Sequence, residues 1–502
     1  MIRPLRHISD PLLLTAMHLL GVVASTCWFL GLLGSTPTRA PVAELGPRES
    51  DIIDADMQYV DRSLEVDVHH DRQVRAVWVA SVDNIDVPSR PGLSAPALRA
   101  ELLAVVELAH EAHLNTLYFQ VRPEGDSLYR SDLEPWSRYL SGEQGRDPGL
   151  DPLQVLLDAA HARGMRVAVW VNPFRAGLRA SDRSVAPHIV VQRPDLVYTY
   201  GGHLWMDPGH DEVQRRTLAV VSDLLDRYDV DGLHIDDYFY PYPNGDRFPD
   251  QRTFADSGAS DLTTWRAQRV DRLVASMHRL ASQAGVPFGV SPFGLYRPGQ
   301  PAGTRGFDQV ASLHADPVRW ARAGHVDELV PQLYWARDHR SLPFDDLARW
   351  WCTTVPDRVV LGHALYKVDR GWGLQELSEQ VRVGREAGCL GDAWFSWKYL
   401  RDDRVRAHFR DRLYPRQALA PAQPGQAPVA PGVRMLGSRA TVLAQEGVRA
   451  VVVYEWVDEA LRVREILGPP PVELATQGSL VVSVVDAGGR ESRGVVLPPA
   501  GL

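Results

Sequence analysis

The stretch DPLQVLLDAAHARGMRVAVWVNP, residues 151–173, joins a capped helix to an apolar strand through one short turn. Asp151 followed by Pro152 is typical of a helix start, because aspartate caps free backbone N–H groups and proline suits the first turn. Gly164 ends the predicted helix, and RVAVWVNP then predicts a strand that is apolar along its whole length. A strand of this kind is buried on both faces, as in a parallel sheet covered by helices.

The same unit recurs along the chain. A second helix begins at Ser94, and a third is predicted from Leu262 to the region of Gly285. Seven more runs predict strands: RAVWVAS (75–81), TLYFQVR (116–122), GLHIDDY (232–238), PFGVSPFG (287–294), ELVPQLYW (328–335), RVVLGHALY (358–366) and GDAWFSWKY (391–399). Eight strands alternating with helices predict an α/β fold of the (β/α)8 TIM-barrel type.

The regions flanking the barrel differ in composition. Arg3 and Arg6 precede an apolar stretch, which predicts an export signal that is either cleaved after Ala40 or kept as a membrane anchor. Short β-branched runs near the C-terminus predict a small all-β sandwich of the fibronectin/immunoglobulin-like type. The predicted segments are therefore 1–40 signal peptide or membrane anchor, 41–71 linker, 72–413 barrel, 414–431 proline-rich linker and 432–502 sandwich.

Composition excludes several kinds of partner. The net charge of −9 argues against nucleic acid as a partner. Neither a metal-ligand motif nor a glycine-rich phosphate loop is present in the sequence, so no metal and no other cofactor is expected. Cys352 and Cys389 remain after removal of the signal, and two cysteines outside the cytoplasm can form one disulfide.

Loop lengths predict where the binding site lies. Helix-to-strand connections are short, whereas the strand-to-helix connections 123–150, 174–207 and 239–260 are long. Long loops at one end of the barrel place the binding apparatus at the C-terminal ends of the strands.

Two adjacent carboxylates lie at that end of the fourth strand, in DGLHIDDYFYP, residues 231–241. Cleavage of a glycosidic bond commonly uses two carboxyl groups, one as proton donor and one as nucleophile or base. Side chains alternate along a strand, so Asp236 is predicted to face inward with His234, and Asp237 to lie close behind. The alternative is that the pair caps the following loop or binds an arginine.

A second catalytic carboxylate is harder to identify, because the predicted strands five to seven end without an acidic residue. Asp126, after the second strand, is the predicted partner, with Glu124, Asp83 and Asp86 as further candidates. A turn-stabilising role beside Gly125 is the alternative for Asp126. The choice between retaining and inverting chemistry stays open, because it depends on the carboxylate separation.

Polar and aromatic residues at the predicted strand ends fit a carbohydrate, whose hydroxyl and acetamido groups need hydrogen bonds and whose rings pack on aromatic faces. Any one such residue is more often structural than functional, so the prediction of a carbohydrate site rests on the strand-end position that they share. The predicted substrate-binding residues are Gln120, Arg122, Trp170, Asn172, Arg175, His234, Tyr238, Gln332, Tyr334, Trp335, Lys367 and Trp397.

Five ordered motifs resemble a known family: FQVRPEGDSLYRSDLEPWS, DPLQVLLDAAHARGMRVAVWVNPFR, YDVDGLHIDDYFYP, FGVSPFGLYR and VPQLYW. They are similar to the bacterial glycoside-hydrolase-like family 10, which includes an envelope glycosidase acting on peptidoglycan strands stripped of stem peptides. The resemblance implies a barrel fold, an envelope location and a glycosidase activity. Glu124 departs from the expected pattern, and the motif positions are occupied by Arg122, Asp126, Asn172, Arg175, Asp236, Asp237, Tyr238, Gln332 and Tyr334.

The sequence therefore predicts an exported glycosidase of the periplasm or cell envelope, with denuded peptidoglycan strands as substrate. Two alternatives are a hydrolase of another envelope polysaccharide or exopolysaccharide and a non-catalytic, glycan-binding wall protein.

Overall fold

The computed structural model describes residues 58–60 and 65–499, so the predicted signal peptide or anchor lies outside the described residues. Within these ranges no helix combines the length and the apolar character needed to cross a membrane.

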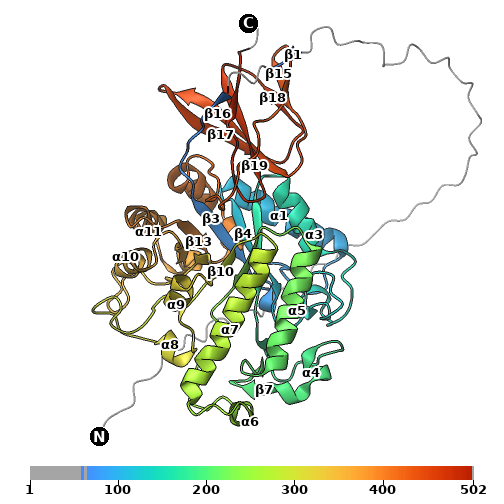
Figure 1. Ribbon diagram of the computed structural model, residues 1–502, viewed down its shortest axis with the longest axis vertical. Helices are drawn as coiled ribbons and strands as arrows, with labels where there is room; N and C mark the ends of the chain where they lie inside the picture. The colour runs from blue at the N-terminus through green and yellow to red at the C-terminus, as the bar shows by residue number, and fades with distance from the viewer. Residues whose placement is uncertain (1–57, 61–64, 500–502) are drawn as a thin grey trace, which may run out of the picture. The chain divides into compact units, whose positions relative to one another are not determined.

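Eight parallel strands form the central sheet, and each lies within one of the eight predicted runs or overlaps it (Figure 1). They are paired in the order β11-β10-β9-β5-β4-β3-β13-β12. Parallel bridges between Leu329 and Val359 and between Gln332 and Gly362 join the two end strands and close the barrel. The strands are β3 (Val74–Val79), β4 (Thr116–Arg122), β5 (Arg166–Val171), β9 (Gly232–Ile235), β10 (Phe288–Val290), β11 (Glu328–Leu329), β12 (Val360–His363) and β13 (Gly391–Trp394).

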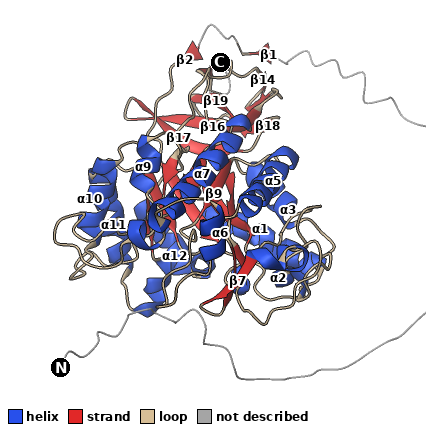
Figure 2. Cartoon of the chain, turned by 60° about the horizontal axis from the view of Figure 1, so that its bottom comes forward, coloured by secondary structure: helices blue, strands red, loops and turns tan. Residues whose placement is uncertain are grey.

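Helices surround these strands (Figure 2), which confirms the predicted α/β barrel. The predicted caps are present, since the Ser94 side chain accepts the Ala97 N–H at 3.4 Å and the Asp151 side chain accepts the Gln154 N–H at 3.2 Å. The longer helices are α1 (Ala95–Glu111), α3 (Pro152–His161), α5 (Asp211–Arg227), α7 (Leu262–Gln283), α10 (Phe344–Thr354) and α11 (Leu374–Glu386), and the shorter α9 (Pro317–Arg322) and α12 (Asp403–His408) complete the ring.

The two faces of β9 show the predicted alternation. Leu233 and Ile235 belong to the large apolar core shared with the helices. His234 points the other way, into the barrel interior, where its ring stacks on Tyr118 with centroids 4.3 Å apart. The residue two positions further on, Asp236, thus starts on the inward side.

A small antiparallel sheet in the long loop after β5 was not predicted. It has the order β6-β8-β7 and consists of β6 (Arg175–Gly177), β7 (Val197–Tyr200) and β8 (His203–Met206). Strands of three or four residues carry too short a pattern to be recognised. The short helices α2 (Arg138–Ser141), α4 (Ile189–Gln192), α6 (Gln251–Asp256) and α8 (Gln309–Ser312) also lie in loops.

The C-terminal strands form two antiparallel sheets with an apolar core between them. Part of the predicted linker 41–71 belongs to these sheets and corrects that expectation: β1 (Gln58–Tyr59) pairs with β14, and β2 (Glu65–Val66) pairs with β20. Edge pairing needs only backbone groups, so the polar sequence gave no signal for it. The other strands are β14 (Val433–Leu436), β15 (Arg439–Val442), β16 (Val448–Val457), β17 (Ala460–Leu467), β18 (Val472–Ala475), β19 (Leu480–Asp486) and β20 (Gly494–Leu497).

The proline-rich segment after the barrel is irregular, and its first part is packed against the barrel. Leu419 is only 7% exposed. Its carbonyl accepts the Gln73 N–H at 2.9 Å, and the Asn115 amide donates to the Ala418 carbonyl at 2.9 Å. Proline and alanine lower the cost of ordering this segment, which acts as a fixed connection to the C-terminal sheets.

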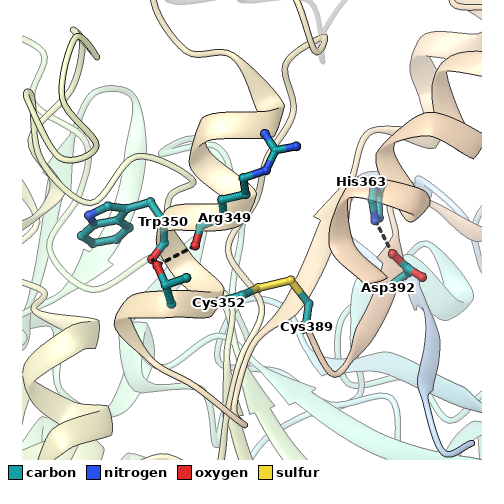
Figure 3. The surroundings of a disulfide bond; sticks show 7 residues. Arg349, Trp350, Cys352, His363, Cys389 and Asp392 are labelled. Atoms are coloured by element: carbon teal, nitrogen blue, oxygen red, sulfur yellow. Dashed lines mark hydrogen bonds and ion pairs between the residues drawn. A yellow bond between two sulfur atoms is a disulfide. The ribbon is translucent and has the colours of Figure 1, made fainter. Parts of the chain in front are cut away.

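Cys352 and Cys389 form a disulfide between α10 and the end of the turn that follows α11 (Figure 3). The bond links residues 37 positions apart and ties two neighbouring helices of the barrel wall together.

Candidate active site

Asp236 and Asp237 lie just beyond the last regular residue of β9, which is Ile235. Because the strand ends there, the alternation that would separate two consecutive side chains no longer applies. Both carboxyl groups are therefore able to turn toward the strand ends, and each residue is only 4% exposed.

Asp236 is held by donors from β5 and from its own loop. Trp170 Nε1 donates to Oδ2 at 3.1 Å, Asn172 Nδ2 lies 3.4 Å from Oδ1, and the Tyr238 N–H donates to Oδ1 at 3.3 Å. Burial and the neighbouring charge of Asp237 nevertheless raise the pKa of Asp236 to about 7. A carboxyl group with this pKa can hold a proton at neutral pH and release it during a reaction.

The amide of Asn172 has a fixed orientation. Its Oδ1 accepts the Arg175 N–H at 2.8 Å, so its NH₂ group must face Asp236. Its backbone carbonyl accepts from Arg122 Nη1 at 2.5 Å, and Arg122 is itself paired with Glu134 in a fully buried ion pair. Arg122 is thus a positioning residue for Asn172 in this structure.

Asp237 is held from the other side. The Tyr242 hydroxyl and the Gln332 amide both donate to its carboxylate. Burial raises the pKa of Asp237, and these two donors oppose that rise. Gln332 also donates to the Ser291 carbonyl at 3.0 Å, which fixes it between β10 and β11. Sequence reasoning missed Tyr242, because it lies in a loop beyond the strand and outside any periodic pattern.

Arg175 lies among the acidic groups. Its Cζ is 5.1 Å from the centre of the Tyr238 ring, and its Nε donates to the Pro123 carbonyl at 3.1 Å. Its charge lowers the pKa of Asp236 and of Asp237 in opposition to their burial. Its Nη2 is buried without a hydrogen-bond partner, so the guanidinium retains one donor for a bound group.

Half-buried aromatic residues follow β11 and β12. Burial raises the pKa of the Tyr334 hydroxyl well above its usual value, and the charge of the nearby Asp237 adds to this rise. Trp335 packs edge-on against Phe293 at 5.6 Å. Lys367 donates to the Tyr334 carbonyl at 2.6 Å and lies over the Trp372 ring. These rings have partly exposed faces on which a sugar can pack.

The loop after β4 contains a second acidic pair. Asp126 is fully buried, and its oxygens accept from the Glu124 N–H at 3.2 Å and from Gln144 Nε2 at 3.3 Å. Burial and the Asp126 charge raise the pKa of Glu124 to about 7. One Glu124 oxygen accepts from the Tyr139 hydroxyl at 3.0 Å, and the other makes no hydrogen bond but lies 3.9 Å from Arg138 Nε. Asp126 therefore has the contacts of a loop-stabilising residue, and Glu124 is the less constrained acid.

Three further predicted substrate contacts are, like Arg122, buried in the protein interior and bonded to protein groups. Trp397 is 0% exposed, and its Nε1 donates to the Val105 carbonyl at 3.1 Å. Gln120 is also fully buried, and its Oε1 accepts backbone N–H groups of residues 81 and 82. His234 is fully buried as well, and burial lowers its pKa to about 3. Position at a strand end does not determine the depth of a side chain, so these three residues contact other protein groups in this structure.

Among the described residues no group of three or more histidine, cysteine, aspartate or glutamate side chains is arranged to hold a metal ion. The site itself presents the carboxyl groups of Asp236 and Asp237 and their hydrogen-bond donors.

A closed (β/α)8 barrel with adjacent acids and partly exposed aromatic rings at its strand ends defines a barrel glycosidase. The chain belongs to the family Glycosyl hydrolase-like 10, which matches residues 73–376. The protein is thus a glycosidase, as predicted, and the reading as a non-catalytic binding protein is not supported.

Two bacterial relatives agree with this class. The chain is 34% identical over 381 residues to "Glycosyl hydrolase YngK" of Bacillus subtilis, a match that spans 70% of this chain and 74% of the relative. It is 35% identical over 346 residues to "Glycosyl hydrolase DigH" of Escherichia coli, spanning 61% of this chain and 79% of the relative. Among solved structures, the glycoside hydrolase domain of PgaB (BpsB) from Bordetella bronchiseptica superposes with a TM-score of 0.49 at 12% identity, covering 70% of this chain and 100% of that domain.

Proposed function

We propose that the protein cleaves glycan strands of the bacterial cell envelope, with peptide-free peptidoglycan strands as its substrate. One observation carries the catalytic part of this proposal. Asp236 is a buried acid whose pKa is raised to about 7, first by burial and then by the charge of Asp237. Such a group can protonate a leaving glycosidic oxygen at neutral pH.

The surroundings support a glycan that lacks large substituents. The acids are only 4% exposed and lie beside the rings of Tyr238 and Tyr334. The similarity of the five sequence motifs to a family with an enzyme for denuded strands supports the same substrate. A stem peptide on the sugar next to the scissile bond would need additional room around these buried groups. A bare strand has no such substituent to accommodate.

Export is part of this proposal. The disulfide between Cys352 and Cys389 supports folding in an oxidising compartment, such as the periplasm. The basic and apolar N-terminal residues 1–40 would supply the export signal or a membrane tether.

The experiment compares intact peptidoglycan with amidase-treated peptidoglycan as substrates for the full chain, and mass spectrometry identifies the soluble products. Release of saturated, peptide-free oligosaccharides from the treated sample alone is the expected result. Asp236→Asn should release none, and the matched control Asp195→Asn, at an aspartate whose side chain is 61% exposed, should retain activity. Cleavage of another envelope polysaccharide but of neither peptidoglycan sample would overturn the proposed substrate, and products with anhydro ends would identify a lyase.

A further inference from the structure

Asp236 and Asp237 extend from one strand end and are hydrogen-bonded on different sides. Asp236 accepts from Trp170, which is on β5, whereas Asp237 accepts from Tyr242 and Gln332. Consecutive residues at one strand end lie on one wall of the site. Enzymes that use two catalytic carboxylates place them on either side of the scissile bond, so that one can act from the face opposite the leaving group.

The other acids near the strand ends are poor candidates for that second role. Asp86 accepts from the Ala80 N–H, the Ser396 hydroxyl and the Lys398 N–H, and Asp126 is similarly occupied in its loop. Glu124 accepts from the Tyr139 hydroxyl at 3.0 Å, and its other oxygen lies 3.9 Å from Arg138 Nε, so both oxygens already have partners within the loop after β4. The chain that follows β10, β11 and β12, at residues 291–294, 330–335 and 364–367, contains no acidic residue.

We propose that the nucleophile is supplied by the substrate, as the carbonyl oxygen of a 2-acetamido group, with Asp237 holding the acetamide N–H and Asp236 acting as the acid. This inference rests on the proposed function and narrows it: the sugar on the non-reducing side of the cleaved bond must be a 2-acetamido-2-deoxyhexose.

The two steps balance without any other reactant. In the first, the acetamide oxygen forms a bond to C1 while the bond from C1 to the glycosidic oxygen breaks, and Asp236 gives its proton to the departing oxygen. The resulting oxazolinium ion keeps its N–H on the Asp237 carboxylate. In the second, water attacks C1 and loses a proton to Asp236, the bond between C1 and the acetamide oxygen breaks, and its electron pair restores the carbonyl. Two displacements at C1 give a product of retained configuration.

The hydrogen bonds support this division of roles. Asp237 accepts from Tyr242 and Gln332, which favours its charged form. The Asp237 backbone N–H is a third donor, and an ionised carboxylate has about four lone-pair sites, so one remains for an acetamide N–H. Asp236 has the raised pKa that retains a proton beside this charge. Two like charges at adjacent positions are avoided when one group is protonated and the other ionised.

The first test is calorimetric titration of the full chain with N-acetylglucosamine-thiazoline, a stable bicyclic analogue of the oxazolinium ion. The thiazoline should bind at least about 100-fold more tightly than N-acetylglucosamine, because analogues of the activated state bind at least about 10²-fold more tightly than ground-state sugars. Asp237→Asn should lose this preference, and Asp195→Asn should keep it. Equal affinity of the wild-type protein for the two ligands would overturn the inference, and this measurement does not depend on any variant folding.

The second test follows the reaction. NMR of fresh product from peptide-free strands should show retained anomeric configuration, and an inverted product would overturn the inference. Strands with free 2-amino groups should not be cleaved until they are re-N-acetylated. On a dinitrophenyl glycoside of the strand repeat, Asp236→Asn should recover activity, because this leaving group needs no proton, whereas Asp237→Asn should not. Recovery by Asp237→Asn alone would overturn the assigned roles.

The two proposals fail in different ways. Cleavage of peptide-free strands without a thiazoline preference leaves the proposed function intact and refutes substrate assistance. Tight thiazoline binding without strand cleavage supports substrate assistance and transfers it to another 2-acetamido glycan.

Discussion

Trp170 Nε1 lies 3.1 Å from Asp236 Oδ2, and this hydrogen bond crosses from β5 to the end of β9. The indole N–H can only donate, so it favours the ionised form of Asp236 and opposes the effect of burial on its pKa. Burial and the Asp237 charge dominate this pKa, and the Trp170 bond is one of the interactions that lower it.

Trp170→Phe should raise the pKa of Asp236 further, because the charged form loses a donor. A general acid must be protonated, so kcat/KM falls as the pH rises above its pKa. The alkaline limb of the pH profile should shift to higher pH in this variant. Trp394→Phe is the matched control, since Trp394 of β13 donates to the Tyr414 hydroxyl at 3.1 Å and not to either acid, and its profile should match the wild type. An unchanged limb in Trp170→Phe would assign the acid role to another group.

The stability of the protein should depend on pH through Asp236. Its pKa is about 7 in the folded protein and 3.8 in the reference state, so between these values the folded state binds more protons than the unfolded state. The free energy of unfolding contributed by this group is highest below the unfolded pKa and decreases as the pH rises toward 7. Asp236→Asn should remove this decrease. The free energy of unfolding of the variant, relative to that of the wild type, should therefore be higher at pH 8 than at pH 4. Urea unfolding at both pH values measures the difference, and parallel behaviour of the two proteins would contradict it.

The barrel could be predicted from the sequence because its strands are buried on both faces and give unbroken apolar runs, as in residues 166–171. β1 and β2 could not be predicted, since each has two residues and is held through backbone pairing at a sheet edge. Hydrophobic patterns report burial, and these segments bury little side-chain surface.

The site was predictable in part for the same reason. Asp236, Asn172 and Gln332 follow strands directly, so topology alone brings them to one end of the barrel. Tyr242 reaches Asp237 only through the path of its loop. Trp397 follows a strand too, but its ring turns into the core. Nothing in its sequence position distinguishes a ring that faces a ligand from one that packs under a helix.

Removal of the Asp126 charge should affect the stability of the protein more than its catalysis. Asp126→Asn replaces an acceptor of the Glu124 N–H and of Gln144, so it should lower the free energy of unfolding by about 1–3 kcal/mol. Its kcat/KM per folded molecule should fall by much less than the roughly 10²-fold expected from loss of a general acid or base. Glu124→Gln keeps the shape of its side chain, and its free energy of unfolding and kcat/KM serve as the comparison. A loss of 10²-fold or more in Asp126→Asn with normal stability would restore Asp126 as a catalytic residue.

The disulfide should contribute substantially to stability. Cys352 and Cys389 are 37 positions apart, and cross-linking a loop of this length stabilises the folded state by about 3–4 kcal/mol. The double variant Cys352→Ser, Cys389→Ser should therefore melt at a lower temperature than the wild type. Reductant should lower the melting temperature of the wild type and leave the double variant unchanged. An effect of reductant on the double variant would show that the reductant does not act through the Cys352–Cys389 bond.

The buried pair of Arg122 and Glu134 separates stability from catalysis. Glu134→Gln leaves the Arg122 charge uncompensated where both side chains are 0% exposed, and loss of one partner of such a pair costs about 3–5 kcal/mol. Replacing both residues, as Arg122→Met with Glu134→Leu, removes the desolvation cost of both charges and should recover most of this stability.

Activity should not recover with it. The double variant still lacks the donor that holds the Asn172 carbonyl, so the Asn172 amide loses its fixed orientation toward Asp236. We expect kcat to fall while KM for glycan strands stays close to that of the wild type, because a positioning residue affects the reacting acid and not the affinity for the ground state. Steady-state kinetics on peptide-free strands measure both constants. A rise in KM with unchanged kcat would instead show that Arg122 contacts the substrate, as the sequence had predicted.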